Sequence, residues 1–342
     1  MKLPFPPRFF SLLSLCAALS FPAIAQTTPI SAVQGSTDES PLKGQTVSVE
    51  GIVTGDFQLP TQFSGFYLQD PLGDGNDATS EGIFVYVNAR SRTASVDVSV
   101  GERVRVKGRV AEHEGQTQIS STSSIEILGT ESVPPPTPVS LPLPSGATLE
   151  QFESMLVTFP QPLTVTGQNE LARFGAITLS AGGRLFVPTN QAKLGALADD
   201  GAIRTIVLDD GSGAQTPKPM PYADANGTRR TGSRVRNLTG ILGFTKEKYR
   251  IQPTVAPVFE ETNPRPAAPP EVGGTLKVAA ANVLNYWTTL QNKANPKARG
   301  AKTPNEFIRQ SAKIVAQLQG MDADIVGLME LENNGATAIS DL

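Results

Sequence analysis

The chain has 342 residues, enough for two or three domains of ordinary size. Hydrophobic residues make up 39% of it, and 31 glycines and 28 prolines accompany few aromatic residues. This composition favours turn-rich β domains over helical bundles. The formal net charge of −3 is not the broad basic excess that nucleic-acid-binding proteins often carry, so any polyanion site must be local.

Residues 1–25 have the features of a secretory signal peptide. Lys2 and Arg8 supply positive charge, and Phe9–Phe21 is apolar but short for a membrane span. Ala23–Ala25 then offers small residues for cleavage before Gln26. An N-terminal membrane anchor is the alternative. We expect a secreted protein, extracellular or periplasmic, with no membrane attachment after cleavage.

Cys16 is the only cysteine, and it lies inside that segment. The mature chain then contains no cysteine, which excludes disulfides and thiol-ligated metal sites. Removing Lys2 and Arg8 leaves 27 basic side chains against 32 acidic ones, a net charge of about −5.

Residues 26–133 are expected to form an OB-like β-barrel domain. Gly and Asp/Asn turns separate short stretches with alternating apolar residues, of which Arg103–Val110 is the clearest. Five or six strands of this length suggest a small barrel of the OB type. The predicted strands are Thr46–Thr54, Gly65–Gln69, Gly82–Val87, Arg103–Val110 and Ser124–Leu128.

Pro-rich linkers at 134–138 and 263–274 enclose a second β-rich region, 139–262. Such runs favour extended chain and form no core. Leu149–Leu156 is predicted to be a short helix. The predicted strands of this region are Leu156–Phe159, Leu163–Thr166, Ala176–Leu179, Leu185–Val187, Thr205–Leu208, Leu238–Leu242 and Tyr249–Gln252.

From residue 275 the pattern changes to strand, helix, strand. Leu276–Ala281 is a predicted strand ending at Asn282, and Ile325–Met329 is a second one ending at Glu330. Between them, Thr303–Glu306 has the sequence of a helix capping box. The two strands of a βαβ unit lie parallel, so Asn282 and Glu330 are expected at the same carboxyl edge. The apolar residues of the predicted helix are Phe307, Ile308, Ile314, Val315 and Leu318.

Two oxygen-bearing side chains at one sheet edge suit a hard divalent cation. Mg²⁺ is usually held by one or two carboxylates, with water and substrate phosphates as the remaining ligands. A metal there polarises a phosphoryl oxygen and stabilises the leaving oxyanion. A cap or a solvated side chain is the alternative role for each of the two residues.

The stretches Leu276–Tyr286 (LKVAAANVLNY) and Asp322–Asn334 (DADIVGLMELENN) are the most specific in the chain. They resemble the first and second motifs of the endonuclease/exonuclease/phosphatase superfamily. With Glu306-Phe307 and Arg309-Gln310 between them, they look like the branch of large extracellular bacterial nucleases. Those proteins carry an OB-like domain ahead of the catalytic one. The resemblance covers most of the mature chain and is specific from residue 275 onwards.

This resemblance implies a secreted nuclease that hydrolyses phosphodiester bonds of DNA, with RNA as the alternative substrate. Residues 275–342 would be the first βαβ portion of an α/β two-sheet-sandwich domain. Asn282 and Glu330 would bind the catalytic Mg²⁺ or Mn²⁺, with Glu330 as the principal ligand.

The family's acid/base residues are not found in this chain. The superfamily needs a later Asp/Asn pair and a C-terminal Asp-His pair, whereas the only histidine is His113, between Glu112 and Glu114. We interpret His113 as an exposed hairpin residue. We therefore expect an N-terminal fragment, or the product of a truncated gene, that is inactive alone. The alternative is a non-catalytic secreted OB-like module that binds DNA or another surface polymer.

Two stretches of basic residues could meet phosphates, with a solvated surface as the alternative for both. Lys293–Lys313 carries six basic residues against Glu306. The other stretch is interleaved with Phe244 and Tyr249, and its members are Arg229, Arg230, Arg234, Arg236, Lys246, Lys248 and Arg250.

The loop Asp70–Asp77 is dense in oxygen ligands and is a candidate Ca²⁺ site. Its spacing is not that of an EF-hand, and ordinary turn chemistry is the alternative. The candidate ligands are Asp70, Asp74, Asn76 and Asp77.

Overall fold

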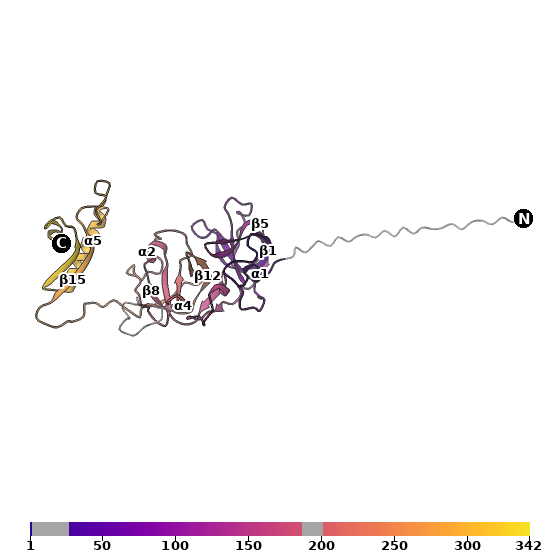
Figure 1. Cartoon of the computed structure of the whole chain (residues 1–342), viewed down its shortest axis with the longest axis horizontal. Helices are drawn as coiled ribbons and strands as arrows, with labels where there is room; N and C mark the ends of the chain where they lie inside the picture. The colour runs from indigo at the N-terminus through magenta and orange to yellow at the C-terminus, as the bar shows by residue number, and fades with distance from the viewer. Residues whose placement is uncertain (2–26, 187–200) are drawn as a thin grey trace. The chain divides into compact units, whose positions relative to one another are not determined.

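Figure 1 shows the computed structural model, which describes residue 1, residues 27–186 and residues 201–342. The chain is mainly β, as predicted, and separates into two compact units, Met1–Asn263 and Pro264–Leu342. The division falls at the start of the predicted linker 263–274. The predicted signal peptide lies outside the described residues apart from Met1. Within those described ranges, no helix is long and apolar enough to cross a membrane.

Five strands of the first unit close into a barrel in the order β1-β2-β3-β5-β4. Strands β3 and β5 are parallel, and the other neighbours are antiparallel. All five strands predicted for this region are present, although β1, β4 and β5 extend beyond their predicted ends. They are β1 (Thr46–Phe57), β2 (Gly65–Gln69), β3 (Gly82–Tyr86), β4 (Glu102–His113) and β5 (Gln116–Thr130).

The barrel core follows from the alternation along β4. Val104 and Val106 are fully buried, whereas Lys107 is exposed, because successive side chains of a strand point to opposite faces. The short helix α1 (Ile30–Gln34) adds Val33 to the same apolar cluster.

The second β-rich region forms a nine-stranded sheet in the order β14-β11-β8-β9-β10-β13-β12-β7-β6. Six of its seven predicted strands are present. The seventh, Leu185–Val187, is not a strand over residues 185–186, and Val187 lies outside the described residues. The strands are β6 (Thr137–Pro138), β7 (Leu156–Phe159), β8 (Leu163–Gly167), β9 (Ile177–Ala181), β10 (Thr205–Leu208), β11 (Arg234–Val235), β12 (Leu238–Thr245), β13 (Lys248–Pro253) and β14 (Phe259–Glu260).

Two predictions in this region need correction. The predicted helix Leu149–Leu156 is only a single 3₁₀ turn, η1 (Glu150–Phe152), because Leu156 already belongs to β7. The Pro-rich linker 134–138 is predicted to be extended chain outside any core. Its last two residues instead form the edge strand β6, which pairs with β7. Proline has no backbone N–H to donate, and an edge strand tolerates it because only one side of that strand is paired. Short helices α2 (Leu171–Phe174) and α4 (Gly201–Arg204) complete the region.

The barrel and the nine-stranded sheet share an apolar contact, which makes them one compact unit. Phe57, Tyr67 and Phe84 of the barrel pack with Leu156 and Ile241 of the sheet. Tyr67 meets Phe84 with ring centroids 4.8 Å apart. The side chains of this contact therefore depend on both regions for burial, although each region also has an apolar cluster of its own.

Backbone meets backbone at one point of this contact. A Cβ built on Gly82 in β3 would lie only 2.3 Å from the carbonyl carbon of Ser154. Neither partner is a flexible side chain, so a larger residue at position 82 forces the two parts of the unit apart.

Gly82→Ala is expected to lower the free energy of unfolding by about 1–3 kcal/mol, measured by urea denaturation. Gly213→Ala is the matched control, because its Cβ would find ordinary contact, with the nearest atom at 3.7 Å. Equal stability of the two variants would contradict the close approach.

A carboxyl group is buried at the same contact. Glu153 is fully buried; its Oε1 accepts a hydrogen bond from the Thr117 amide at 3.0 Å, and its Oε2 has no partner. Burial, followed by the neighbouring Glu150 carboxylate, raises the pKa of Glu153 well above 4.5. The folded protein therefore favours the protonated form.

A raised carboxyl pKa contributes stability at low pH that is lost as pH rises from about 4.5 through the folded pKa. Glu153→Gln removes this loss. Relative to wild type, the variant is expected to gain thermal stability between pH 4 and pH 8, measured by melting temperature at each pH. The exposed Glu247→Gln variant should keep the wild-type profile.

The second unit is a βαβ arrangement with a short final helix. Strands β15 (Val278–Tyr286) and β16 (Ile325–Leu331) are parallel, as predicted. Helix α5 (Pro304–Met321) begins at the predicted capping box, in which the Thr303 side chain accepts from the Glu306 amide. Helix α6 is Thr337–Asp341.

Only part of the predicted apolar face of α5 packs. Ile314, Phe307 and Leu318 join the small core with Val283 and Tyr286. Ile308 is 64% exposed, although its sequence position suggested that face.

Candidate functional site

The structure brings Asn282 and Glu330 together at the predicted carboxyl edge of the parallel pair. Asn282 is the last residue of the regular β15–β16 register, opposite Met329. Its Nδ2 donates to Glu330 Oε1 at 2.7 Å. The predicted end of β15 at Asn282 is the end of this regular pairing, since the strand continues irregularly to Tyr286.

The backbone bends sharply around this pair. Asn282 Oδ1 accepts the Leu284 amide at 2.9 Å, which turns the chain back over the strand end. The turn lets the Asn285 amide donate to Glu330 Oε2 at 3.1 Å. Leu284, Asn285 and Glu330 have φ of 52°, 56° and 66°, a left-handed region that residues other than glycine seldom adopt. Such strain often collects at functional sites.

Glu330 has the better fit to a divalent cation. Its exposed carboxylate is held by two donors, and each oxygen keeps capacity for another partner. Asn282 instead directs its amide nitrogen at Glu330, so in this arrangement it orients the carboxylate. No three His, Cys, Asp or Glu side chains of the described chain gather as a metal-binding group. Water and substrate phosphates would have to complete the coordination of Mg²⁺ or Mn²⁺.

Glu332 is a neighbouring carboxylate that the sequence did not single out. It accepts from the Thr288 hydroxyl at 2.9 Å, the Thr289 amide at 3.1 Å and Asn334 Nδ2 at 2.8 Å. Burial opposes its ionisation, but the hydrogen bonds from Thr289 and Thr288 prevail and lower its pKa. Glu332 therefore ties the β16 end to the segment after β15. Its position two residues after Glu330 was the available signal.

The basic residues of the Lys293–Lys313 stretch are solvent-facing. All six are exposed, and no described carboxylate forms an ion pair with them. They belong to the same unit as Glu330 and remain available to a polyanion. They are Lys293, Lys297, Arg299, Lys302, Arg309 and Lys313.

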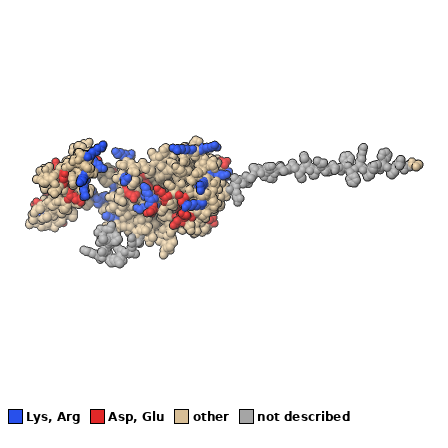
Figure 2. All heavy atoms as spheres, turned by 45° about the horizontal axis from the view of Figure 1, so that its top comes forward, with Lys and Arg blue, Asp and Glu red and all other residues tan. Residues whose placement is uncertain are grey.

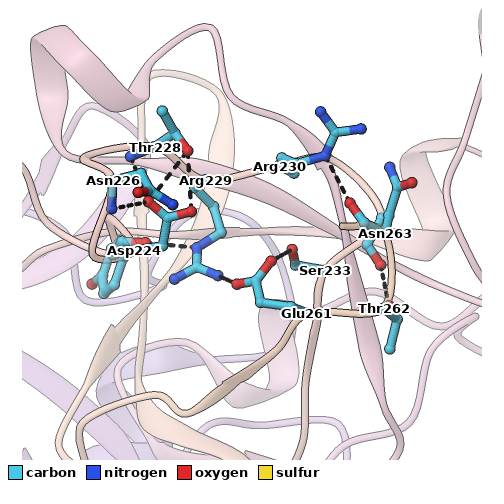
Figure 3. A network of polar contacts seen from close by, with 11 residues as sticks. Asp224, Asn226, Thr228, Arg229, Arg230, Ser233, Glu261, Thr262 and Asn263 are labelled. Carbon is cyan, nitrogen blue, oxygen red and sulfur yellow. Dashed lines mark hydrogen bonds and ion pairs between the residues drawn. The ribbon is translucent and has the colours of Figure 1, made fainter. Parts of the chain in front are cut away.

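The seven basic candidates of the first unit are not one surface. Arg229 is 7% exposed and pairs with Glu261, while its Nε donates to the Tyr222 carbonyl at 2.6 Å. Figure 3 shows this network, in which Arg230 also donates to the carbonyl of Asn263. These two guanidinium groups hold segments of the sheet together.

Arg250 is the second buried member. It is 3% exposed, and its guanidinium contacts Asp209 at 3.0 Å and Glu170 at 3.4 Å. Arg236 pairs with Glu260 on the surface, and Lys246 lies 4.3 Å from the ring centroid of Phe174.

The other two of the seven, Lys248 and Arg234, are exposed. Lys248 lies 3.6 Å from Glu170, and Arg234 is exposed on β11. Figure 2 shows basic and acidic side chains interspersed on the visible face of this unit.

The candidate Ca²⁺ loop uses its oxygens on its own backbone. Asp70 Oδ1 accepts from the Leu72 amide at 3.0 Å, and Asp74 Oδ1 accepts from the Asn76 amide at 2.7 Å. Asn76 Oδ1 accepts from the Ala78 amide at 3.2 Å. Hydrogen bonding, led by the Asn76 amide, lowers the pKa of Asp74. These are Asx turns, which the alternative interpretation of this loop expects.

Comparisons with known proteins add little. No protein-family model matches the chain, and no curated protein matches it. Among solved structures, that of the hypothetical protein ygiW from E. coli is similar to part of it. The identity is 16%, the match covers 25% of this chain and 77% of that one, and the TM-score is 0.19.

Arg250→Met is expected to destabilise the protein by about 3–5 kcal/mol, because it leaves Asp209 buried without its cation. Arg236→Met is the control, since it removes an arginine from an exposed pair and should leave the unfolding midpoint unchanged. Both are measured by chemical denaturation. Wild-type stability of Arg250→Met would mean that this arginine is not structural.

Proposed function

We propose that the second unit provides the metal-binding edge of a secreted, metal-dependent phosphodiesterase that acts on DNA, with RNA as the alternative substrate. The observation that carries this proposal is the contact between Asn282 and Glu330 at the ends of two parallel strands. Ligand sites of α/β sheets lie at that edge. Mg²⁺ or Mn²⁺ bound there would polarise a phosphoryl oxygen and stabilise the leaving oxyanion.

The residues around Glu330 support this chemistry in distinct ways. Asn282 and the Asn285 amide hold the carboxylate in one orientation, and precise orientation of a ligand raises metal affinity. The exposed basic residues from Lys293 to Lys313 suit a phosphate backbone.

An uncovered apolar surface supports the proposal that this unit works as part of a larger domain. Val278, Ile325 and Met329 on the two-stranded sheet are 68%, 54% and 46% exposed. Two strands alone bury little, and apolar patches on a sheet usually meet a partner surface. Further strands of a two-sheet sandwich would cover them. The chain's one histidine, His113, belongs to the barrel, so we expect no DNA cleavage by this chain alone.

The barrel fits the accessory role that the proposal gives it. The strand order β1-β2-β3-β5-β4, closed with β3 parallel to β5, agrees with a five-stranded OB-type barrel. Fold alone does not establish what such a barrel binds. A purely binding role for the chain is the second candidate, which is favoured by a cavity with aromatic walls in the first unit.

Glu330→Gln is expected to weaken Mn²⁺ binding by the chain at least about tenfold, because it removes the charged ligand. Binding is measured by Mn²⁺ electron paramagnetic resonance. Glu271→Gln, in the exposed linker, should bind as wild type does. Undiminished binding by Glu330→Gln would show that the assigned ligand is wrong.

A protein product that joins residues 275–342 to a segment carrying an Asp-His pair is expected to cleave DNA in Mg²⁺ or Mn²⁺. In that product Glu330→Ala should reduce cleavage on the order of 100-fold or more. Wild-type cleavage by that variant would remove Glu330 from the reaction.

A further inference from the structure

A cavity of about 350 Å³ lies in the first unit, between the barrel and the nine-stranded sheet. Strands β2, β3 and β5 contribute one side of it, and β12 and β13 contribute the other. A single nucleoside or a compound of similar size fits this volume. None of the residues in the metal-site proposal lines it.

Aromatic side chains form the barrel side of the cavity. Tyr67 and Phe84 are buried, with Phe63 and Tyr86 half-buried beside them. Burial raises the pKa of Tyr67, so its hydroxyl stays protonated at physiological pH. Such walls favour a ligand with broad apolar faces.

One side-chain amide on the lining of this cavity has no partner within the described protein. Gln118 on β5 lines it and is only 7% exposed. No described residue hydrogen-bonds to its side chain, whereas the neighbouring Gln116 is held by the Phe244 amide and by Ser154. An amide offers an adjacent donor and acceptor. Both groups of Gln118 are free to pair with a ligand that has a matching polar edge, and Gln118 is the residue to which we assign that pairing.

A second amide lies on the opposite side. Gln252 on β13 is 3% exposed, and its Oε1 has no hydrogen-bond partner. Gly243, also on the lining, keeps this side open, because a Cβ there would lie 3.1 Å from the Tyr67 hydroxyl.

The charges of the lining disfavour an anionic ligand, because Glu114 and Asp209 carry carboxylates against one guanidinium. Among the described lining residues Arg250 is the one Lys or Arg, and it is already paired with Asp209, which also lines the cavity. It has no free charge for a phosphate. The four aromatic side chains of the lining offer flat faces, which suit a planar ring.

We propose that this cavity binds an uncharged planar nitrogen heterocycle, a nucleobase, through the donor and acceptor of the Gln118 amide between aromatic walls. A Gln amide pairs well with the adjacent donor and acceptor of a base edge. The base comes either from a free nucleoside or from one unstacked residue of a single strand. His113 and Glu114, exposed at the hairpin between β4 and β5, line the cavity as well.

The test is titration calorimetry of the whole chain with adenosine and cytidine. We expect a Kd below about 1 mM. Caffeine is a planar purine without an N–H donor, so it can accept a hydrogen bond from the Gln118 amide but cannot donate one to it. It should therefore bind about tenfold more weakly. Glucose should not bind. Absence of nucleoside binding, or binding of glucose alone, would overturn the proposal.

Gln118→Leu keeps a similar size but removes both polar groups, and should weaken adenosine binding at least about tenfold. Gln161→Leu is the matched control: it makes the same change at a glutamine whose Oε1 has no partner but which lies away from the cavity lining. Equal affinity of wild type and Gln118→Leu would overturn the proposal. If Gln118→Leu does not fold, Tyr86→Ala at the half-buried wall replaces it, with the same expected weakening.

The source of the base is decided by a single-stranded pentanucleotide. Tighter binding than adenosine indicates a base within a strand, and equal or weaker binding indicates a free nucleoside. Because the cavity lies wholly in the first unit, Glu330→Gln should leave adenosine binding intact, and Gln118→Leu should leave Mn²⁺ binding intact. Loss of adenosine binding and loss of Mn²⁺ binding can therefore be measured separately.

Discussion

The apolar contact between barrel and sheet is the interaction on which the first unit depends. It consists of three aromatic side chains of the barrel that pack on two aliphatic side chains of the sheet, namely Phe57, Tyr67 and Phe84 on Leu156 and Ile241. The barrel and the sheet each have an apolar cluster of their own, and this contact joins them through a third, smaller cluster. Joining them gives a shared core, and the same junction encloses Glu153 and leaves the cavity that exposes the Gln118 amide.

Charge has two separate uses in this chain. In the first unit, Arg229 and Arg250 are buried against carboxylates and hold segments of the sheet in place. Removing the carboxylate partner would leave a buried guanidinium without its counter-charge, which is why these pairs act as structural ties. In the second unit, the basic residues from Lys293 to Lys313 stay in solvent, where they can attract a polyanion.

Parallel pairing has the same organising role in the second unit. It places the ends of β15 and β16 side by side, and helix α5 is the crossover that makes this direction possible. Asn282 and Glu330 are 48 residues apart in the chain yet form one hydrogen bond. The left-handed backbone at Leu284 and Glu330 then aims an amide and a carboxylate at each other.

The sequence by itself determined the local elements: period-two alternation located the barrel strands, and the capping box at Thr303 located the start of α5. It also determined that Asn282 and Glu330 share an edge, because a βαβ unit has one strand direction. Tertiary structure alone decided which arginines are buried, that the first Pro-rich linker ends as an edge strand, and that a cavity surrounds Gln118. Those features depend on residues far along the chain, such as Asp209 for Arg250 and β7 for β6. Local sequence patterns do not predict which distant segments come into contact.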